Sequence, residues 1–94
     1  MRFLHTDFSG GPDLFASVTL DRGANVMLLD DVAFASYKRG GSFRYYGGWA
    51  SRSPVVLSPP HYAHWHVVID LGGQSGTVCA GVRILRRSAQ GMLF

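Results

Sequence analysis

The stretch His64-Trp65-His66-Val67-Val68-Ile69-Asp70 decides the fold of this protein. Its residues alternate between an apolar set (Trp65, Val67, Ile69) and a mixed set (His64, His66, Val68, Asp70). A period of two is typical of a β-strand, whose successive side chains point to opposite faces of a sheet. We therefore expect a strand over 64–71, ended by the turn residues Gly72-Gly73, with its apolar set facing a core.

The same alternation recurs on both sides of this stretch, between clusters of turn residues. It is clearest over 14–20, where Leu14, Ala16, Val18 and Leu20 share one face. Gly and Pro clusters interrupt the chain about every ten residues, which favours a sandwich or barrel. The expected strands are 3–8, 14–20, 25–29, 43–46, 54–58, 64–71 and 76–85, with Gly47-Gly48 breaking the fourth.

The only helix that the sequence predicts covers 30–37. Asp31 is the expected N-cap, and Gly40-Gly41 ends the segment. All six acidic residues are Asp, and eight of the nine basic residues are Arg. Because Glu and Lys are the usual surface residues of helices, their scarcity argues against a helical bundle.

These patterns predict an all-β protein, a single compact antiparallel β-sandwich (jelly-roll-like) of about seven short strands with one short helix. A chain of 94 residues is one domain. We expect the sandwich over 1–85 and a frayed C-terminal tail over 86–94. The predicted core is Leu14, Val18, Val26, Leu28, Val55, Leu57, Trp65, Val67, Ile69, Val78, Val82 and Ile84.

Composition excludes several classes of protein. A single cysteine, Cys79, rules out an internal disulfide framework, and its place between Val78 and Ala80 predicts a buried strand residue. The sequence has no apolar run long enough to span a membrane, and its first ten residues do not form a secretory signal. We expect a cytoplasmic protein with no membrane partner.

The positive charge is concentrated in one segment. The net charge is +3, yet residues 36–53 carry Lys38, Arg39, Arg44 and Arg52 without any acidic residue. Aromatic and glycine residues alternate with these cations, a mixture that binds phosphates, stacks on rings or anchors protein interfaces. The alternative is that the aromatic side chains pack over the sandwich edge and the Arg residues are solvated. The predicted ligand-binding residues are Tyr37, Lys38, Arg39, Arg44, Tyr45, Tyr46, Trp49 and Arg52.

Three histidines form a second cluster, His61, His64 and His66. On a strand, His64 and His66 share a face about 7 Å apart, within reach of one ion, and His5 or Asp70 could complete a ligand set. Asp30-Asp31 could also hold a divalent ion, although a helix cap explains that pair more simply. Solvated or backbone-bonded histidines are the simpler alternative here, so we expect no cofactor.

Several motifs, in order along almost the whole chain, resemble a small bacterial family, the domain of unknown function 1883. Members occur as stand-alone small proteins and N-terminal to TIR domains. The resemblance implies a β-rich, cytoplasmic, bacterial domain with a recognition or sensing role. The motifs are Ala24–Asp31 (ANVMLLDD), Tyr37–Gly40 (YKRG), Arg44–Gly48 (RYYGG), Ser53–Val55 (SPV) and His64–Asp70 (HWHVVID).

The favoured function is therefore a non-catalytic binding or sensing module that uses segment 37–52. Its ligand would be a protein, a phosphorylated small molecule such as a nucleotide, or a carbohydrate. A nucleic-acid-binding domain is the first alternative, disfavoured because five Asp and only two Arg lie in residues 1–35. A small metalloprotein built on His61, His64 and His66 is the second. A homo-oligomer also fits, because open sheet edges need covering.

Overall fold

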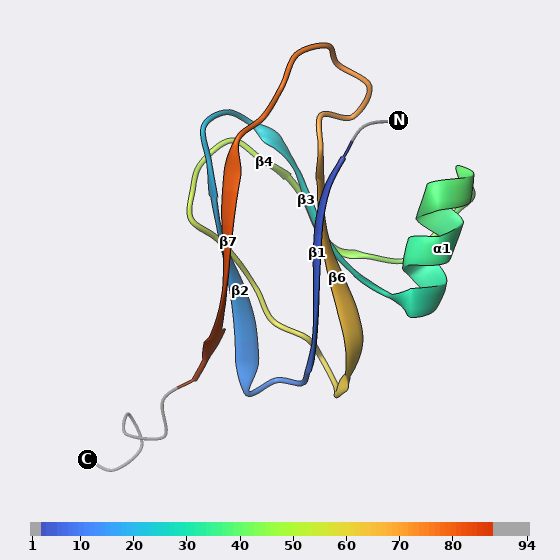
Figure 1. The fold of residues 1–94 in the computed structure, drawn as a ribbon, viewed down its shortest axis with the longest axis vertical. Coiled ribbons are helices and arrows are strands. Elements are labelled where there is room, and N and C mark those ends of the chain that lie inside the picture. The colour runs from blue at the N-terminus through green and yellow to red at the C-terminus, as the bar shows by residue number, and fades with distance from the viewer. Residues whose placement is uncertain (1–2, 88–94) are drawn as a thin grey trace.

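The computed structural model describes residues 3–87, which fold into seven strands and one helix (Figure 1). The elements are β1 (Leu4–Gly10), β2 (Leu14–Leu20), β3 (Ala24–Asp30), α1 (Asp31–Arg39), β4 (Tyr46–Ala50), β5 (Val55–Leu57), β6 (Ala63–Asp70) and β7 (Ala80–Arg86).

The strands form two facing sheets, in the orders β1-β6-β3-β4 and β5-β2-β7, and every pair is antiparallel. The chain crosses repeatedly between the sheets, and the predicted jelly-roll-like β-sandwich with one short helix is confirmed (Figure 1). Strand β6 lies inside its sheet, where Trp65 pairs with Phe8 of β1 and with Asp30 of β3. The alternating stretch is thus the centre of the larger sheet.

The main core fills the space between the sheets. Within β6, Trp65, Val67 and Ile69 are each at most 1% exposed, as their alternation predicted. The predicted residues Val18, Val26, Leu28 and Leu57 are also buried there. Val55, Val78, Val82 and Ile84 pack against this core from its periphery, and Leu14 is half-buried.

A second, smaller core lies on the opposite face of the larger sheet, under helix α1 (Figure 1). The helix contributes Ala33, Phe34 and Tyr37, and the sheet contributes Met27, Leu29 and Val68. The alternation within β3 and β6 did not predict this core, because each of those outward faces mixes apolar with polar residues. Burial of these apolar side chains holds a helix of only nine residues on the sheet.

The helix is capped at both ends, although not by the predicted residue. Asp30 is the N-cap, and its Oδ1 accepts a hydrogen bond from the Ala33 amide at 2.8 Å, so the prediction of Asp31 was wrong by one residue. Gly40 ends the helix in the left-handed conformation, with φ of 78°. Because Asp30 performs the capping, the carboxylate of Asp31 is free for other contacts.

Two further predictions were wrong. Gly47 and Gly48 lie within β4, and Gly47 lets this strand approach β3 closely, since a Cβ there would lie 2.2 Å from the Val26 carbonyl oxygen. Cys79 is exposed, because β7 begins only at Ala80 and Cys79 belongs to the preceding loop.

Strand β7 extends to Arg86, one residue into the predicted tail, and 88–94 lie outside the described residues. Among residues 3–87, no helix has the length and apolar character needed to cross a membrane.

Candidate functional site

The outward face of β6 carries two polar centres, one beneath each end of helix α1. His64 and His66 lie near the start of the helix, and Asp70 lies nearer its end. Val68 separates them and packs in the core under the helix. We call the first centre the His-Asp cluster, consisting of His5, Asp7, Asp31, His64 and His66. We call the second the Asp70 centre, consisting of Asp70, Tyr37 and Asn25.

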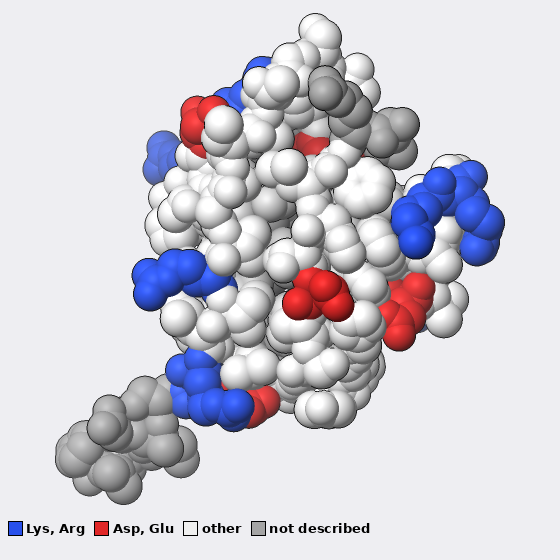
Figure 2. All heavy atoms as spheres, viewed as in Figure 1, with Lys and Arg blue, Asp and Glu red and all other residues white. Residues whose placement is uncertain are grey.

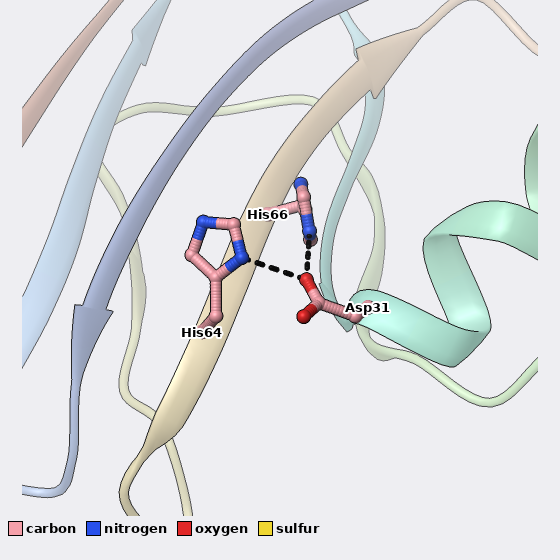
Figure 3. A group of neighbouring side chains, drawn as sticks. All are labelled: Asp31, His64 and His66. Atoms are coloured by element: carbon pink, nitrogen blue, oxygen red, sulfur yellow. Dashed lines mark hydrogen bonds and ion pairs between the residues drawn. The ribbon is translucent and has the colours of Figure 1, made fainter.

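The His-Asp cluster joins β1, β6 and the first residue of α1. Asp31 Oδ1 lies 2.7 Å from His64 Nδ1 and 2.6 Å from His66 Nε2 (Figure 3). The other nitrogen of His64, Nε2, lies 2.6 Å from Asp7 Oδ2. The other nitrogen of His66, Nδ1, lies 2.8 Å from His5 Nε2. The five side chains therefore form one continuous chain of contacts, Asp7–His64–Asp31–His66–His5.

These contacts limit where the protons of the cluster can lie. Each nitrogen of His64 faces a carboxylate oxygen, so both must donate, and the ring is an imidazolium. His66 Nε2 donates to Asp31, and a single proton lies between His66 Nδ1 and His5 Nε2, either of which can be the donor. We infer these protonation states from the partners of each nitrogen.

The electrostatics of the cluster agree with this assignment. Hydrogen bonds to Asp7 and Asp31 raise the pKa of His64 above its ordinary value. The hydrogen bond from His64 lowers the pKa of Asp7, and those from His66 and His64 lower the pKa of Asp31. Partial burial and the neighbouring His66 lower the pKa of His5. The pKa shifts of His64, Asp7 and Asp31 thus all favour the charged forms that pair with one another.

Phe34 packs against two histidines of the cluster. Its ring stacks on His5 at a centroid distance of 4.4 Å and on His66 at 4.3 Å. The ammonium of Lys38, one of the predicted ligand-binding residues, lies 4.6 Å from the centroid of Phe34. The cluster therefore rests on a hydrophobic base supplied by the helix.

The Asp70 centre is buried and uses neutral donors. Asp70 is 5% exposed, and its Oδ2 accepts from the Tyr37 hydroxyl at 2.6 Å. Its Oδ1 accepts from Asn25 Nδ2 and from the Gly72 amide, both at 2.9 Å. Burial and the Asp70 carboxylate raise the pKa of the Tyr37 hydroxyl well above its ordinary range. Three donors thus hold one buried carboxylate at the end of β6.

A pocket of about 320 Å³ adjoins the Asp70 centre. Part of its lining comes from segment 37–52, namely Tyr37, Gly40, Gly41, Phe43 and Tyr45, and the rest is Asn25, Met27, Asp70 and Gly72. A larger pocket of about 670 Å³ is lined by Phe3 and Leu4, by the end of β6 and by the loop over 73–78. The sequence did not predict the larger pocket, and it did not predict that Asn25 lines the smaller one.

The predicted ligand-binding residues are only partly brought together. Tyr37 and Tyr45 line the smaller pocket, whereas Tyr46 lies near Trp65 at the edge of β4 and Trp49 is 52% exposed. Arg39, Arg44 and Arg52 are exposed, and none has an ion pair with any acidic residue of the described part of the chain. Figure 2 shows cationic residues at the far end of the helix and acidic residues at its start and over β1.

Of the three histidines proposed as metal ligands, the structure brings two together. His64 and His66 join Asp31, whereas the ring of His61 lies 5.2 Å from the core residue Trp65. His5 and Asp70 were the two residues expected to complete a ligand set. His5 does contact the cluster, whereas Asp70 belongs to the other centre. The sequence did not predict Asp7 as a member of the cluster, because only the pairing of β1 with β6 places it opposite His66.

Fold and site together define a class, a small antiparallel β-sandwich domain with a helix laid over two polar centres of one sheet. Within that class the chain belongs to the family described as domain of unknown function (DUF1883), whose family model matches residues 1–88. The resemblance found in the sequence motifs is thereby confirmed. Neither the curated proteins nor the solved structures gave a significant match.

Proposed function

We propose that the protein is a non-catalytic binding module, and that its ligand is a small molecule with a planar ring and an anionic group, as in a nucleotide. The observation that carries this proposal is the pocket of about 320 Å³ between segment 37–52 and the Asp70 centre. Its volume is at the lower end of the range of small-molecule sites, and it combines aromatic walls with a few polar groups.

The aromatic wall suits a planar ring. Tyr37 is buried, the ring of Phe43 meets it edge-on at 5.3 Å, and the half-exposed Tyr45 follows at 5.5 Å from Phe43. This row leads from the core to the surface and ends in a ring with an accessible face. Stacking of a base on such a ring contributes about 1–3 kcal/mol.

The polar groups suit the rest of the ligand. A carboxylate has about four lone-pair sites, and Asp70 uses three of them for protein donors, which leaves one for a ligand N–H. Arg39 and Arg44 flank the pocket residues in sequence and have no acidic partner among residues 3–87. Their guanidinium groups are available to a phosphate or carboxylate.

The family resemblance implies a recognition role in a bacterial cytoplasm, and the binding module proposed here is compatible with that role. We propose that the module works in the bacterial cytoplasm as a recognition unit, and that relatives joined to TIR domains use it to receive an input. The proposal assigns no reaction to the chain.

Titration of the ¹⁵N-labelled protein with AMP, GMP, CMP and UMP tests the proposal. We expect amide shifts at Gly40, Gly41 and Tyr45, and binding weakened about tenfold in Tyr45→Ala and in Arg44→Ala. The matched controls are Tyr62→Ala, a 76% exposed tyrosine, and Arg83→Ala in the other sheet, which should bind normally.

Absence of localised shifts with all four nucleotides would overturn the nucleotide assignment. Binding of single-stranded DNA or RNA with a steep salt dependence, without saturable binding of mononucleotides, would instead favour a nucleic-acid-binding domain.

A further inference from the structure

We propose that Asp31, His64 and His66 form a binding site for a divalent transition-metal ion, Zn²⁺ being the ion that best suits two imidazoles and one carboxylate. Asp7 and His5 complete the site as partners of the outer imidazole nitrogens. This inference is independent of the pocket at the other end of the helix.

The donor atoms already converge. One ligand atom from each of Asp31, His64 and His66 lies within 4.8 Å of the others (Figure 3). In a tetrahedral zinc site with bonds of about 2.0–2.1 Å, donor atoms are about 3.3 Å apart. The two nitrogen-to-oxygen distances here are 2.7 and 2.6 Å, so each needs to lengthen by well under 1 Å. The two histidine nitrogens lie within 4.8 Å of each other and need to adjust to the same spacing. The side chain of Asp31 is 64% exposed, which leaves it room to move.

Asp31 is free to act as a ligand because the helix does not need it. Asp30 accepts the hydrogen bond from the first turn, and Asp31 directs its oxygen toward the two histidines of β6 instead. Helix capping, the simplest alternative role for Asp31, is therefore already performed by Asp30.

The outer nitrogens provide an independent argument for the site. A metal-bound histidine nearly always donates its other N–H to a carboxylate or another acceptor, which orients the ring. His64 Nε2 has Asp7 Oδ2 at 2.6 Å, and His66 Nδ1 has His5 Nε2 at 2.8 Å. With the ion in place of the protons that face Asp31, the Nε2–H of His64 donates to Asp7. The Nδ1–H of His66 donates to His5 Nε2, in the tautomer of His5 that carries its proton on Nδ1. Both ligands thus have an acceptor in place.

The charges also favour a dication. The cluster contains two carboxylates, Asp7 and Asp31, whose negative charges sum to two. A divalent ion bound to neutral imidazoles cancels both. Three protein ligands leave at least one coordination position, and Asp31 and His64 are partly exposed, so this position is open to water or an incoming ligand.

Zinc binding to the tag-free, chelator-treated protein, measured by calorimetry and by competition with a chromophoric chelator, tests the site. We expect one equivalent of Zn²⁺ to bind and to raise the melting temperature. His64→Ala and Asp31→Asn should each weaken binding at least 100-fold. Asp7→Asn, which keeps the shape and removes only an outer charge, should weaken it about tenfold.

The matched control is His61→Ala, because His61 is an exposed histidine of the same region that lies outside the cluster. It should bind zinc like the original protein. Circular dichroism of each variant reports whether the fold persists, and His64 is exposed enough to be replaced without opening the core. No uptake of one equivalent, or an equal loss in His61→Ala and His64→Ala, would overturn the proposal.

Discussion

The two ends of helix α1 contact the same sheet in opposite ways. At its start, the partly exposed side chains of Asp31 and His64 form hydrogen-bonded ion pairs with each other and with their neighbours. Near its end, a single carboxylate, Asp70, is 5% exposed and bonded to neutral donors. The apolar residue Val68 lies between the two centres.

Exposure decides what each centre can exchange with its surroundings. The His-Asp cluster faces solvent, so a proton or a metal ion can enter and leave it. The Asp70 centre is closed on its protein side by Tyr37 and Asn25, and Asp70 lines both the smaller and the larger pocket. One helix thus completes a cluster of ionisable side chains at one end and part of the wall of a pocket at the other.

Removal of the packing that both centres share should have the largest effect. Phe34 is 8% exposed and stacks on His5 and His66. We expect Phe34→Ala to lower the free energy of unfolding by about 3–5 kcal/mol, because it creates a cavity under the helix. Urea denaturation measures the change. Val32→Ala on the same helix is the control, since Val32 is 80% exposed and its truncation should cost less than about 0.5 kcal/mol. Equal losses in the two variants would show that Phe34 does not hold the helix.

Removal of one donor should weaken the Asp70 centre alone. Tyr37→Phe deletes the hydroxyl that donates to Asp70 and leaves a buried carboxylate with fewer donors. The expected cost is about 1.5–3 kcal/mol in urea denaturation. Zn²⁺ affinity at the other end of the helix should not change. Tyr45→Phe is the control, because Tyr45 is 48% exposed and its hydroxyl is accessible to water. A joint loss of zinc affinity and stability in Tyr37→Phe would mean that the two ends are coupled.

Substitutions of the two adjacent aspartates, Asp30 and Asp31, should distinguish helix capping from ion binding. Asp30→Ala removes the N-cap and should cost about 1 kcal/mol of stability, with zinc affinity unchanged. Asp31→Asn should do the reverse, weakening zinc binding at least 100-fold with a smaller effect on the stability of the metal-free protein. Asp30→Asn, which retains a capping oxygen, is the control for the first change. If zinc uptake followed Asp30 instead, the assignment of the two residues would be wrong.

The sequence predicted the sandwich better than it predicted the site, for a physical reason. Alternation over 64–70 is local, so Trp65, Val67 and Ile69 could be placed in the core directly. The His-Asp cluster depends on which strand pairs with β6 and on where the helix begins. His5 and Asp7 come from a strand almost sixty residues away in the chain, and no local pattern marks them as partners. Segment 37–52 was recognised by composition, but which of its rings line a pocket follows from packing.

The pH dependence of the metal-free protein should show the smallest effect, and its direction follows from the pKa shifts. The pKa of His64 is raised in the folded state, so its contribution to stability is complete below about pH 6.5, its unfolded pKa, and is lost as pH rises through the folded value. The pKa of Asp7 is lowered, so its contribution is complete above about pH 3.9 and is lost as pH falls through the folded value. The pair therefore stabilises the fold most between about pH 4 and 6.5.

The variant Asp7→Asn tests whether the Asp7 charge causes this pH dependence. Asparagine keeps an acceptor for His64 Nε2 but removes the charge, so the pKa of His64 should move toward its ordinary value. In the presence of chelator, the original protein should lose more stability between pH 6 and pH 9 than the variant does, as measured by urea denaturation at each pH. The lowered pKa of His5 acts in the opposite direction, because a neutral folded imidazole favours higher pH. Since the charge of Asp7 raises the pKa of His5, its removal lowers that pKa further and adds to the expected difference between the two proteins. Identical pH profiles would show that Asp7 does not stabilise the charged form of His64, and the exposed end of the helix would then resemble the buried end in relying on neutral hydrogen bonds.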